Sequence, residues 1–99
     1  MENTIHVIGE ADPVLRCSIE GLDWSDILLW IEYVTHPVNG RTVARSDVGV
    51  IEGLEDKYNL GEGNFKILNA NLNDSGPYEC RNILAPVVQM SAELLVLGE

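Results

Sequence analysis

The stretch Asp74-Ser75-Gly76-Pro77-Tyr78-Glu79-Cys80 (DSGPYEC) decides how the rest of this chain is interpreted. It places an Asp, a Gly and a Tyr at alternate positions and a cysteine two residues after the Tyr. Taken alone, this pattern indicates a turn followed by the start of a strand. Its meaning depends on what lies upstream, where the other cysteine, Cys17, is found.

Size and composition indicate one folded domain spanning residues 1–99. The chain has 99 residues, which is the length of a single domain with one modest core. Hydrophobic residues make up 45% of it, too many for a disordered chain. No apolar run reaches the roughly 18 residues that a membrane-spanning helix needs.

The chain is strongly acidic, with a formal net charge of -10 at pH 7. This charge argues against nucleic acid and anionic membrane surfaces as partners, because both require clustered Lys and Arg. A soluble surface, a basic protein partner or Ca²⁺ would each account for it. The acids Glu20, Asp23 and Asp26 lack the regular spacing of a calcium-binding loop, so no metal or other cofactor is predicted.

Two cysteines, Cys17 and Cys80, are too few for a zinc site of thiolates alone, and they form no CxxC motif. They predict a disulfide and therefore an oxidising compartment. The alternative is a pair of buried free thiols in a cytosolic domain. Met1-Glu2-Asn3 does not begin a signal peptide, so we expect a secreted protein to be represented here by a mature fragment.

Short strands separated by turn residues run through the whole chain. Polar and apolar residues mostly alternate, and clusters of Gly, Pro, Asn and Asp recur about every 8 to 12 residues, with no convincing helical pattern. This indicates an all-β sandwich or barrel. The predicted strands are Thr4–Ile8, Val14–Glu20, Ile27–Tyr33, Arg41–Arg45, Lys57–Leu60, Asn64–Ala70, Pro77–Ile83 and Val87–Leu97, with an irregular or edge segment at Ser46–Glu55.

Cys17, Trp30 and the D-x-G-x-Y-x-C pattern from Asp74 to Cys80 together resemble the immunoglobulin superfamily, over nearly the whole chain. The resemblance implies an immunoglobulin-like two-sheet Greek-key sandwich, V-set or I-set-like. The segment between Tyr33 and Lys57 has room for the extra edge strands of a V-set domain, although it is a little short for an antibody-like one. A V-set or V/I-intermediate domain is therefore expected.

Within that superfamily, short strings around Tyr58, Asn69 and Tyr78 are similar to amino-terminal domains of nephrin- and Kirrel-like adhesion molecules. Invertebrate self-recognition receptors with V-like domains fit about equally. The chain lacks the G-x-G bulge of antibody joining segments, so an antibody light or heavy chain is not expected.

The resemblance gives the motif residues structural roles. Cys17 and Cys80 would bridge the two sheets, with Trp30 packed against their disulfide. The Tyr78 hydroxyl would bond to backbone a few residues upstream.

Two further roles fall on the turn before Tyr78. Gly76 would occupy a position where a side chain would clash. Asp74 would form a single-contact salt bridge with Lys57, because Lys is less suited than Arg to a two-contact pair.

Strand alternation predicts apolar side chains on the outer side of a sheet. If Trp30 faces the core, Leu29 and Ile31 point away from it. The loop after Cys80 is also apolar, and in V-type domains this sheet and this loop dock partner domains. The expected partner-binding residues are Leu29, Ile31, Tyr33, Arg81, Ile83, Leu84, Val88 and Met90.

The sequence leaves a second role open for several of these residues. The apolar side chains could pack under the chain's own edge strands and loops. Arg81 and Glu79 could be selective charge pairs or solvated surface charges. Trp24, in the first long loop, could be a further anchor or could fold back on its own domain.

Catalysis has no support in the sequence, and no enzyme activity or small-molecule substrate is predicted. His6 and His36 are expected to be exposed, and neither belongs to a catalytic or metal-ligating motif. Asn73 begins an N-x-S glycosylation signal, but the turn before Tyr78 demands the same residues.

These observations favour an extracellular recognition or adhesion domain of a membrane-anchored protein. It would bind another immunoglobulin-type domain, its own copy included, through the sheet face bearing Leu29, Ile31 and Tyr33. One alternative is an intracellular structural module of a giant muscle-type protein. Another is a soluble immune recognition domain.

Overall fold

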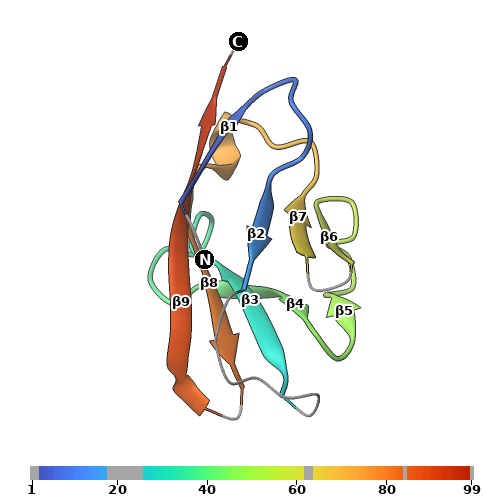
Figure 1. Ribbon diagram of the computed structural model, residues 1–99, viewed down its shortest axis with the longest axis vertical. Coiled ribbons are helices and arrows are strands. Elements are labelled where there is room, and N and C mark those ends of the chain that lie inside the picture. Colours follow the sequence, from blue (N-terminus) through green and yellow to red (C-terminus); the bar gives the residue numbers. More distant parts are fainter. Residues whose placement is uncertain (1–2, 18–25, 62–63, 84, 99) are drawn as a thin grey trace.

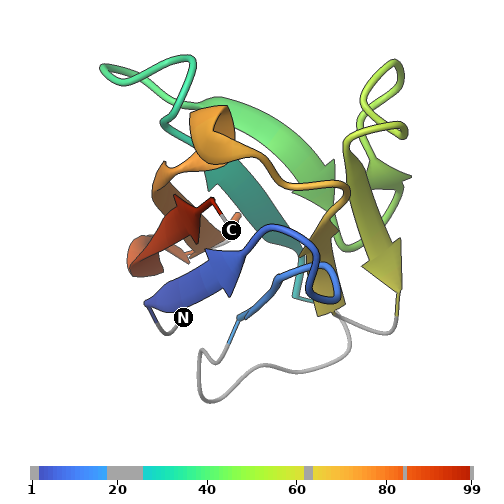
Figure 2. The ribbon, with the colours of Figure 1, turned by 90° about the horizontal axis from the view of Figure 1, so that it is seen from above.

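The computed structural model describes residues 3–17, 26–61, 64–83 and 85–98 as a sandwich of two β-sheets (Figures 1 and 2). The larger sheet has the strand order β1-β9-β8-β3-β4-β5, and the smaller has the order β2-β7-β6. The strands are β1 (Thr4–Val7), β2 (Val14–Arg16), β3 (Leu28–Glu32), β4 (Arg41–Arg45), β5 (Gly49–Val50), β6 (Tyr58–Gly61), β7 (Asn64–Ile67), β8 (Gly76–Asn82) and β9 (Ala85–Leu97).

The predicted all-β class is confirmed, and the strand positions agree with those predicted to within a few residues. β2 and β7 end earlier than predicted, and residues 18–20 lie outside the described part of the chain. The segment predicted to be irregular contains only the two-residue edge strand β5. β1 runs parallel to β9, while the other strand pairings within the described ranges are antiparallel.

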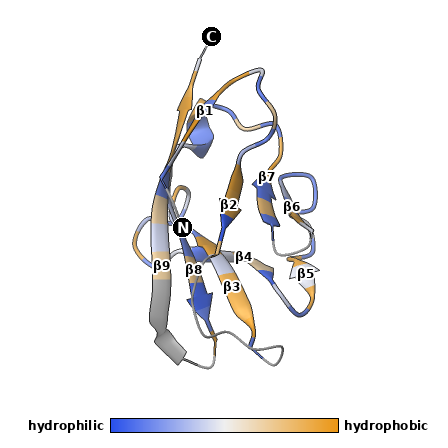
Figure 3. Ribbon diagram, in the orientation of Figure 1, coloured by the Kyte–Doolittle hydropathy of each residue, from blue (hydrophilic) through white to orange (hydrophobic). Residues whose placement is uncertain are grey.

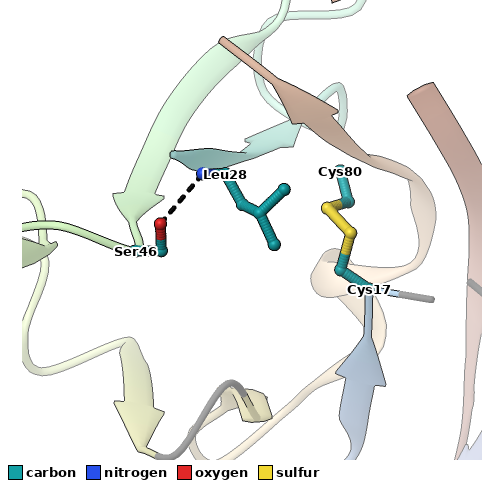
Figure 4. Close-up of a disulfide and its surroundings, with 4 residues drawn as sticks. All are labelled: Cys17, Leu28, Ser46 and Cys80. Atoms are coloured by element: carbon teal, nitrogen blue, oxygen red, sulfur yellow. Dashed lines mark hydrogen bonds between the residues drawn. A yellow bond between two sulfur atoms is a disulfide. The ribbon is translucent and has the colours of Figure 1, made fainter. Parts of the chain in front are cut away.

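The core lies between the two sheets and is crossed by the Cys17–Cys80 disulfide, whose Cα atoms are 5.8 Å apart. Trp30 is the register partner of Cys80 on β8, and both side chains are fully buried. Phe65 from the smaller sheet stacks on Trp30 with ring centroids 6.0 Å apart. The Leu28 side chain points toward the disulfide from β3 (Figure 4). Inner and outer faces are therefore fixed by a covalent link and the aromatic side chains around it.

The turn before Tyr78 contains the contacts that the motif predicts. The short 3₁₀ helix η1 (Leu72–Asp74) begins after Asn71, whose side chain accepts a hydrogen bond from the backbone of Asn73. Lys57 Nζ contacts Asp74 Oδ2 at 2.5 Å, which confirms a single-contact salt bridge. The Tyr78 hydroxyl donates to the carbonyl of Asp74 at 2.7 Å.

Gly76 occupies the predicted crowded position. Its φ of +146° lies in the region that L side chains rarely adopt. A Cβ at this position would lie 2.8 Å from Val34 Cγ2, so a larger residue would collide with the chain that follows β3.

The carboxylate of Glu32 is buried at the end of β3. Glu32, the last residue of β3, is only 1% exposed. It accepts a hydrogen bond from Thr35 Oγ1 at 2.6 Å, and Arg41 Nη2 lies 3.4 Å away. These partners offset part of the cost of burying the charge. Burial, and then the nearby Glu32 charge, raise the pKa of Tyr58.

Removing the disulfide should destabilise the domain markedly. Replacing Cys17 and Cys80 together with Ala should lower the free energy of unfolding by about 4 kcal/mol, because the unfolded chain then gains the freedom of an open loop. Guanidinium unfolding of both proteins, with and without a reducing agent, measures the difference. The double variant serves as the control, since the reductant should not change it. An unfolding midpoint in the wild type that is indifferent to reductant would contradict the pairing.

Alkaline pH should destabilise the domain through its tyrosines. The pKa values of Tyr33, Tyr58 and Tyr78 are all raised above 10, with burial as the largest cause. Unfolded tyrosines ionise near 10. The contribution of these tyrosines to stability is therefore complete below about pH 10. It is lost as the pH rises through their pKa values in the folded protein. Phenolate absorbance should increase at higher pH in the folded protein than in denaturant, and coincident titration curves would refute this.

Candidate functional site

Strand register separates the inner from the outer side of the larger sheet. Trp30 pairs with Cys80 on one side and with Ala44 on the other, and all three are buried in the core. Leu29 and Ile31 alternate with Trp30 and therefore lie on the outer side. The predicted division of β3 into an inner and an outer row is confirmed, and we call the outer side of β3, β4 and β8 the outer face.

The expected open apolar row is only partly present, because Ile31 is 8% exposed. A Cβ built on Gly40 would lie 2.6 Å from Ile31 Cγ2 and 2.7 Å from Tyr33 Cε1, so the turn backbone and both side chains are in close contact. The left-handed φ of +72° at Gly40 permits this approach. Ile31 is thus sheltered by its own domain, while Leu29 and Tyr33 stay half-buried and accessible.

Charged side chains occupy the middle of the outer face. Glu79, the register partner of Ile31, is 6% exposed, so it is not a solvated surface charge, which was one of the two roles that the sequence left open. Arg81 Nη2 lies 2.6 Å from Glu79 Oε1. Burial, followed by the charge of the nearby Glu79, raises the pKa of Tyr33. The predicted Arg81 is therefore paired with the buried Glu79, while Arg81 and Tyr33 themselves stay half-buried.

A second ion pair lies beside this cluster. Arg45, the register partner of Leu29 on β4, contacts Asp47 through both Nε and Nη2, at 3.0 Å and 2.8 Å. The hydrogen bond from Arg45 lowers the pKa of Asp47. Each arginine on the outer face is thus matched by a carboxylate, and the described part of this face is charge-balanced although the chain carries -10. Figure 3 shows the hydrophobic colour of β3 beside a hydrophilic stretch of β8.

The remaining predicted partner-binding residues are placed less uniformly. Ile83, which directly follows β8, is exposed. Leu84 and the side chain of Val88 lie outside the described residues, as does Trp24. Met90 is the register partner of Cys80, so it lies on the inner side of the sheet. The prediction that Met90 belongs to the outer face is therefore wrong.

His6 was expected to be exposed, but it is 5% exposed and lies on the inner side of β1. The reason is the parallel pairing of β1 with β9, which sets His6 opposite the buried Val96. His36 is exposed as predicted. Among the described residues, no group of three or more His, Cys, Asp or Glu side chains is arranged to hold a metal ion. The described segments also contain no helix long and apolar enough to cross a membrane.

Sequence reasoning missed a second exposed apolar group on the same sheet. Ile5 of β1 pairs with Leu95 of β9, and they are 68% and 48% exposed. Leu97, also exposed, is the next outer residue of β9. Only the β1–β9 register brings these residues together, and nothing in the sequence pattern indicated that pairing.

Comparison with known proteins gives no match to a family model and none to a curated protein. Solved structures do match. The first immunoglobulin domain of mouse SynCAM 2 has a TM-score of 0.78 and 22% identity, covering 99% of this chain and 93% of that one. The ZIG-8–RIG-5 IG1-IG1 heterodimer matches with a TM-score of 0.71 and 18% identity. The match covers 96% of this chain and 82% of that one.

A third structure shows parallel homodimers of the extracellular domains of the voltage-gated sodium channel beta4 subunit and relates them to its role in cell-cell adhesion. It gives a TM-score of 0.63 at 14% identity, covering 99% of this chain and 92% of that one. The chain has the immunoglobulin V-type fold. Variable-type domains have two more strands in one sheet than constant-type domains have. In this V-type domain those strands are β4 and β5, which lie beside β3, the strand that carries Trp30.

Truncating Ile31 in the V-type domain should cost stability although it lies on an outer face. Ile31→Ala should lower the free energy of unfolding by about 2–4 kcal/mol, because the side chain is buried. Leu29→Ala, on the same strand and face but half-buried, is the matched control and should cost less. Denaturant unfolding compares the two. Equal losses would mean that Ile31 is as open as its neighbour.

Proposed function

We propose that this chain is an extracellular recognition and adhesion domain that binds another immunoglobulin-type domain, its own copy included, through the outer face of β3, β4 and β8. The observation that carries the proposal is a face that combines accessible apolar groups with balanced charge. Leu29 and Tyr33 supply apolar and aromatic contact area, of the kind enriched at interface cores. Two arginine–carboxylate pairs surround them without net charge.

Charge balance matters because two copies of a -10 chain repel each other. The outer face contributes little to that repulsion, since Arg45 and Arg81 are both paired with acids. Exposed acids such as Glu52, Glu55 and Asp56 lie in the connection between β5 and β6 and not on β3, β4 or β8. At physiological ionic strength, charges further apart than about 8 Å are largely screened. A second copy is therefore an acceptable partner at this face.

The disulfide supports the extracellular location, because such bonds persist in oxidising compartments. It argues against the intracellular muscle-type module. The similar solved structures include an IG1-IG1 heterodimer and homodimers with a role in cell-cell adhesion, which supports another domain of this fold as the partner. We extend the proposal to a membrane-anchored full-length protein, in which this domain would be presented at the cell surface.

The test is sedimentation of the domain over a concentration series. Leu29→Asp should weaken self-association at least tenfold, which is about 1.4 kcal/mol, because it places an unpaired charge in the contact. Leu95→Asp is the matched control. It makes the same change on an exposed leucine of the same sheet, on β9, and should leave association unchanged.

Thermal unfolding verifies that both variants are folded. If Leu95→Asp weakens self-association and Leu29→Asp does not, the contact lies on β1 and β9 and the proposed face is wrong. A wild-type domain that stays monomeric at about 1 mM, a concentration that detects contacts of about 4 kcal/mol, would contradict the homophilic form.

A further inference from the structure

A polar groove lies at one end of the sandwich, between the connection from β1 to β2 and the connection from β7 to η1. Figure 1 shows both connections at the end where β9 finishes. The groove has a volume of about 430 Å³, within the range of ligand sites. It is lined by His6, Ile8, Gly9, Glu10, Asp12, Asn69, Ala70 and Asn71, none of which belongs to the outer face.

The carboxylates of the groove are held in place by the backbone. Glu10 Oε1 accepts from the backbone N–H of Val7 at 2.9 Å. Asp12 Oδ1 accepts from the backbone N–H of Asn69 at 3.1 Å, which joins the two walls of the groove. Each carboxylate has a second oxygen for which the described residues show no partner, so both can accept further hydrogen bonds.

His6 provides an independent sign that the groove takes a ligand. Its side chain forms part of the groove wall and is 5% exposed, yet the described residues include no hydrogen-bond partner for its ring. Neither ring nitrogen is among the buried unpaired side-chain atoms of the described residues, so His6 is reached from the groove itself. A neutral imidazole offers one acceptor nitrogen, which a donor placed in the groove could satisfy.

The negative charge of Glu10 and Asp12 favours a positively charged ligand in the groove. No Lys or Arg lines it. Four of the six basic residues of the chain are already paired with acids elsewhere, so they do not neutralise Glu10 and Asp12. A donor-only cation fits these acceptors, whereas an anion would be repelled. With two carboxylates and one imidazole the groove does not form a metal-holding group, which favours an organic cation over a metal ion.

We propose that this groove binds a guanidinium group, as carried by an arginine side chain. The planar guanidinium has five N–H donors and no acceptor, and it pairs with carboxylates through two parallel hydrogen bonds. Its apolar stem would lie against Ile8 and Ala70, as the stems of long cationic side chains do. Glu10 and Asp12 would bind the charged head, and His6 would accept one further hydrogen bond.

The experiment titrates the 99-residue domain with N-acetyl-arginine amide while amide chemical shifts are followed by NMR. Saturable shifts are expected at His6, Gly9, Asn69 and Asn71. The citrulline analogue, which has the same shape without the charge, should bind at least tenfold more weakly. Free arginine carries an additional carboxylate, so weaker binding by it points to an arginine within a polypeptide, and equal binding points to a small-molecule source.

Glu10→Gln and Asp12→Asn each keep the oxygen that accepts the backbone hydrogen bond, and each should weaken binding at least tenfold. The matched control is Glu55→Gln. Glu55 is an exposed acid that also accepts a backbone hydrogen bond, from Gly53 at 2.9 Å. Its replacement removes the same charge without touching the groove and should leave binding unchanged.

Thermal unfolding shows that the variants remain folded. The proposal is overturned if citrulline binds as well as arginine, if Glu55→Gln weakens binding as much as Glu10→Gln, or if no saturable shift occurs. None of these outcomes depends on self-association through the outer face, so the two proposals fail separately.

Discussion

The disulfide between Cys17 and Cys80 is the constraint on which the rest of the structure depends. It joins β8 to the end of β2 across the core, and Trp30 lies directly beside Cys80 in the sheet. Once these side chains face inward, alternation assigns every other residue of β3 and β8 to the outer face. Glu79 and Arg81 are consequently placed beside Leu29 and Ile31, and the turn at Gly40 packs against Ile31.

The outer face contains both buried and accessible side chains. Ile31 and Glu79 are almost fully buried by their own domain, so they stabilise the fold more than they contribute contact area. Tyr33 lies close to both, because its ring lies against Gly40 and the nearby Glu79 charge raises its pKa. Leu29 and Tyr33 are left partly open around a charge-balanced centre. Such a surface is suited to a reversible contact, since both arginines on its described part are paired with carboxylates.

The roles of the motif residues could be predicted because the resemblance to the immunoglobulin superfamily implies them, and the structure contains the contacts that it implies. Lys57 reaches Asp74, the Tyr78 hydroxyl reaches the carbonyl of Asp74, and Gly76 takes the conformation that its neighbours require. Long-range pairing was not visible. The parallel register of β1 with β9 buried His6 and exposed Ile5, and alternation along one strand carries no information about its neighbour. The groove beside His6 depends on the same pairing.

The central claim, that partner binding uses the outer face of β3, β4 and β8, is tested most directly by comparing NMR spectra of dilute and concentrated domain. Concentration-dependent shifts should be confined to this face, with the largest changes at Leu29, Tyr33, Arg45 and Arg81. Shifts confined to Ile5, Leu95 and Leu97 on β1 and β9 would place the contact elsewhere on the sheet and contradict it.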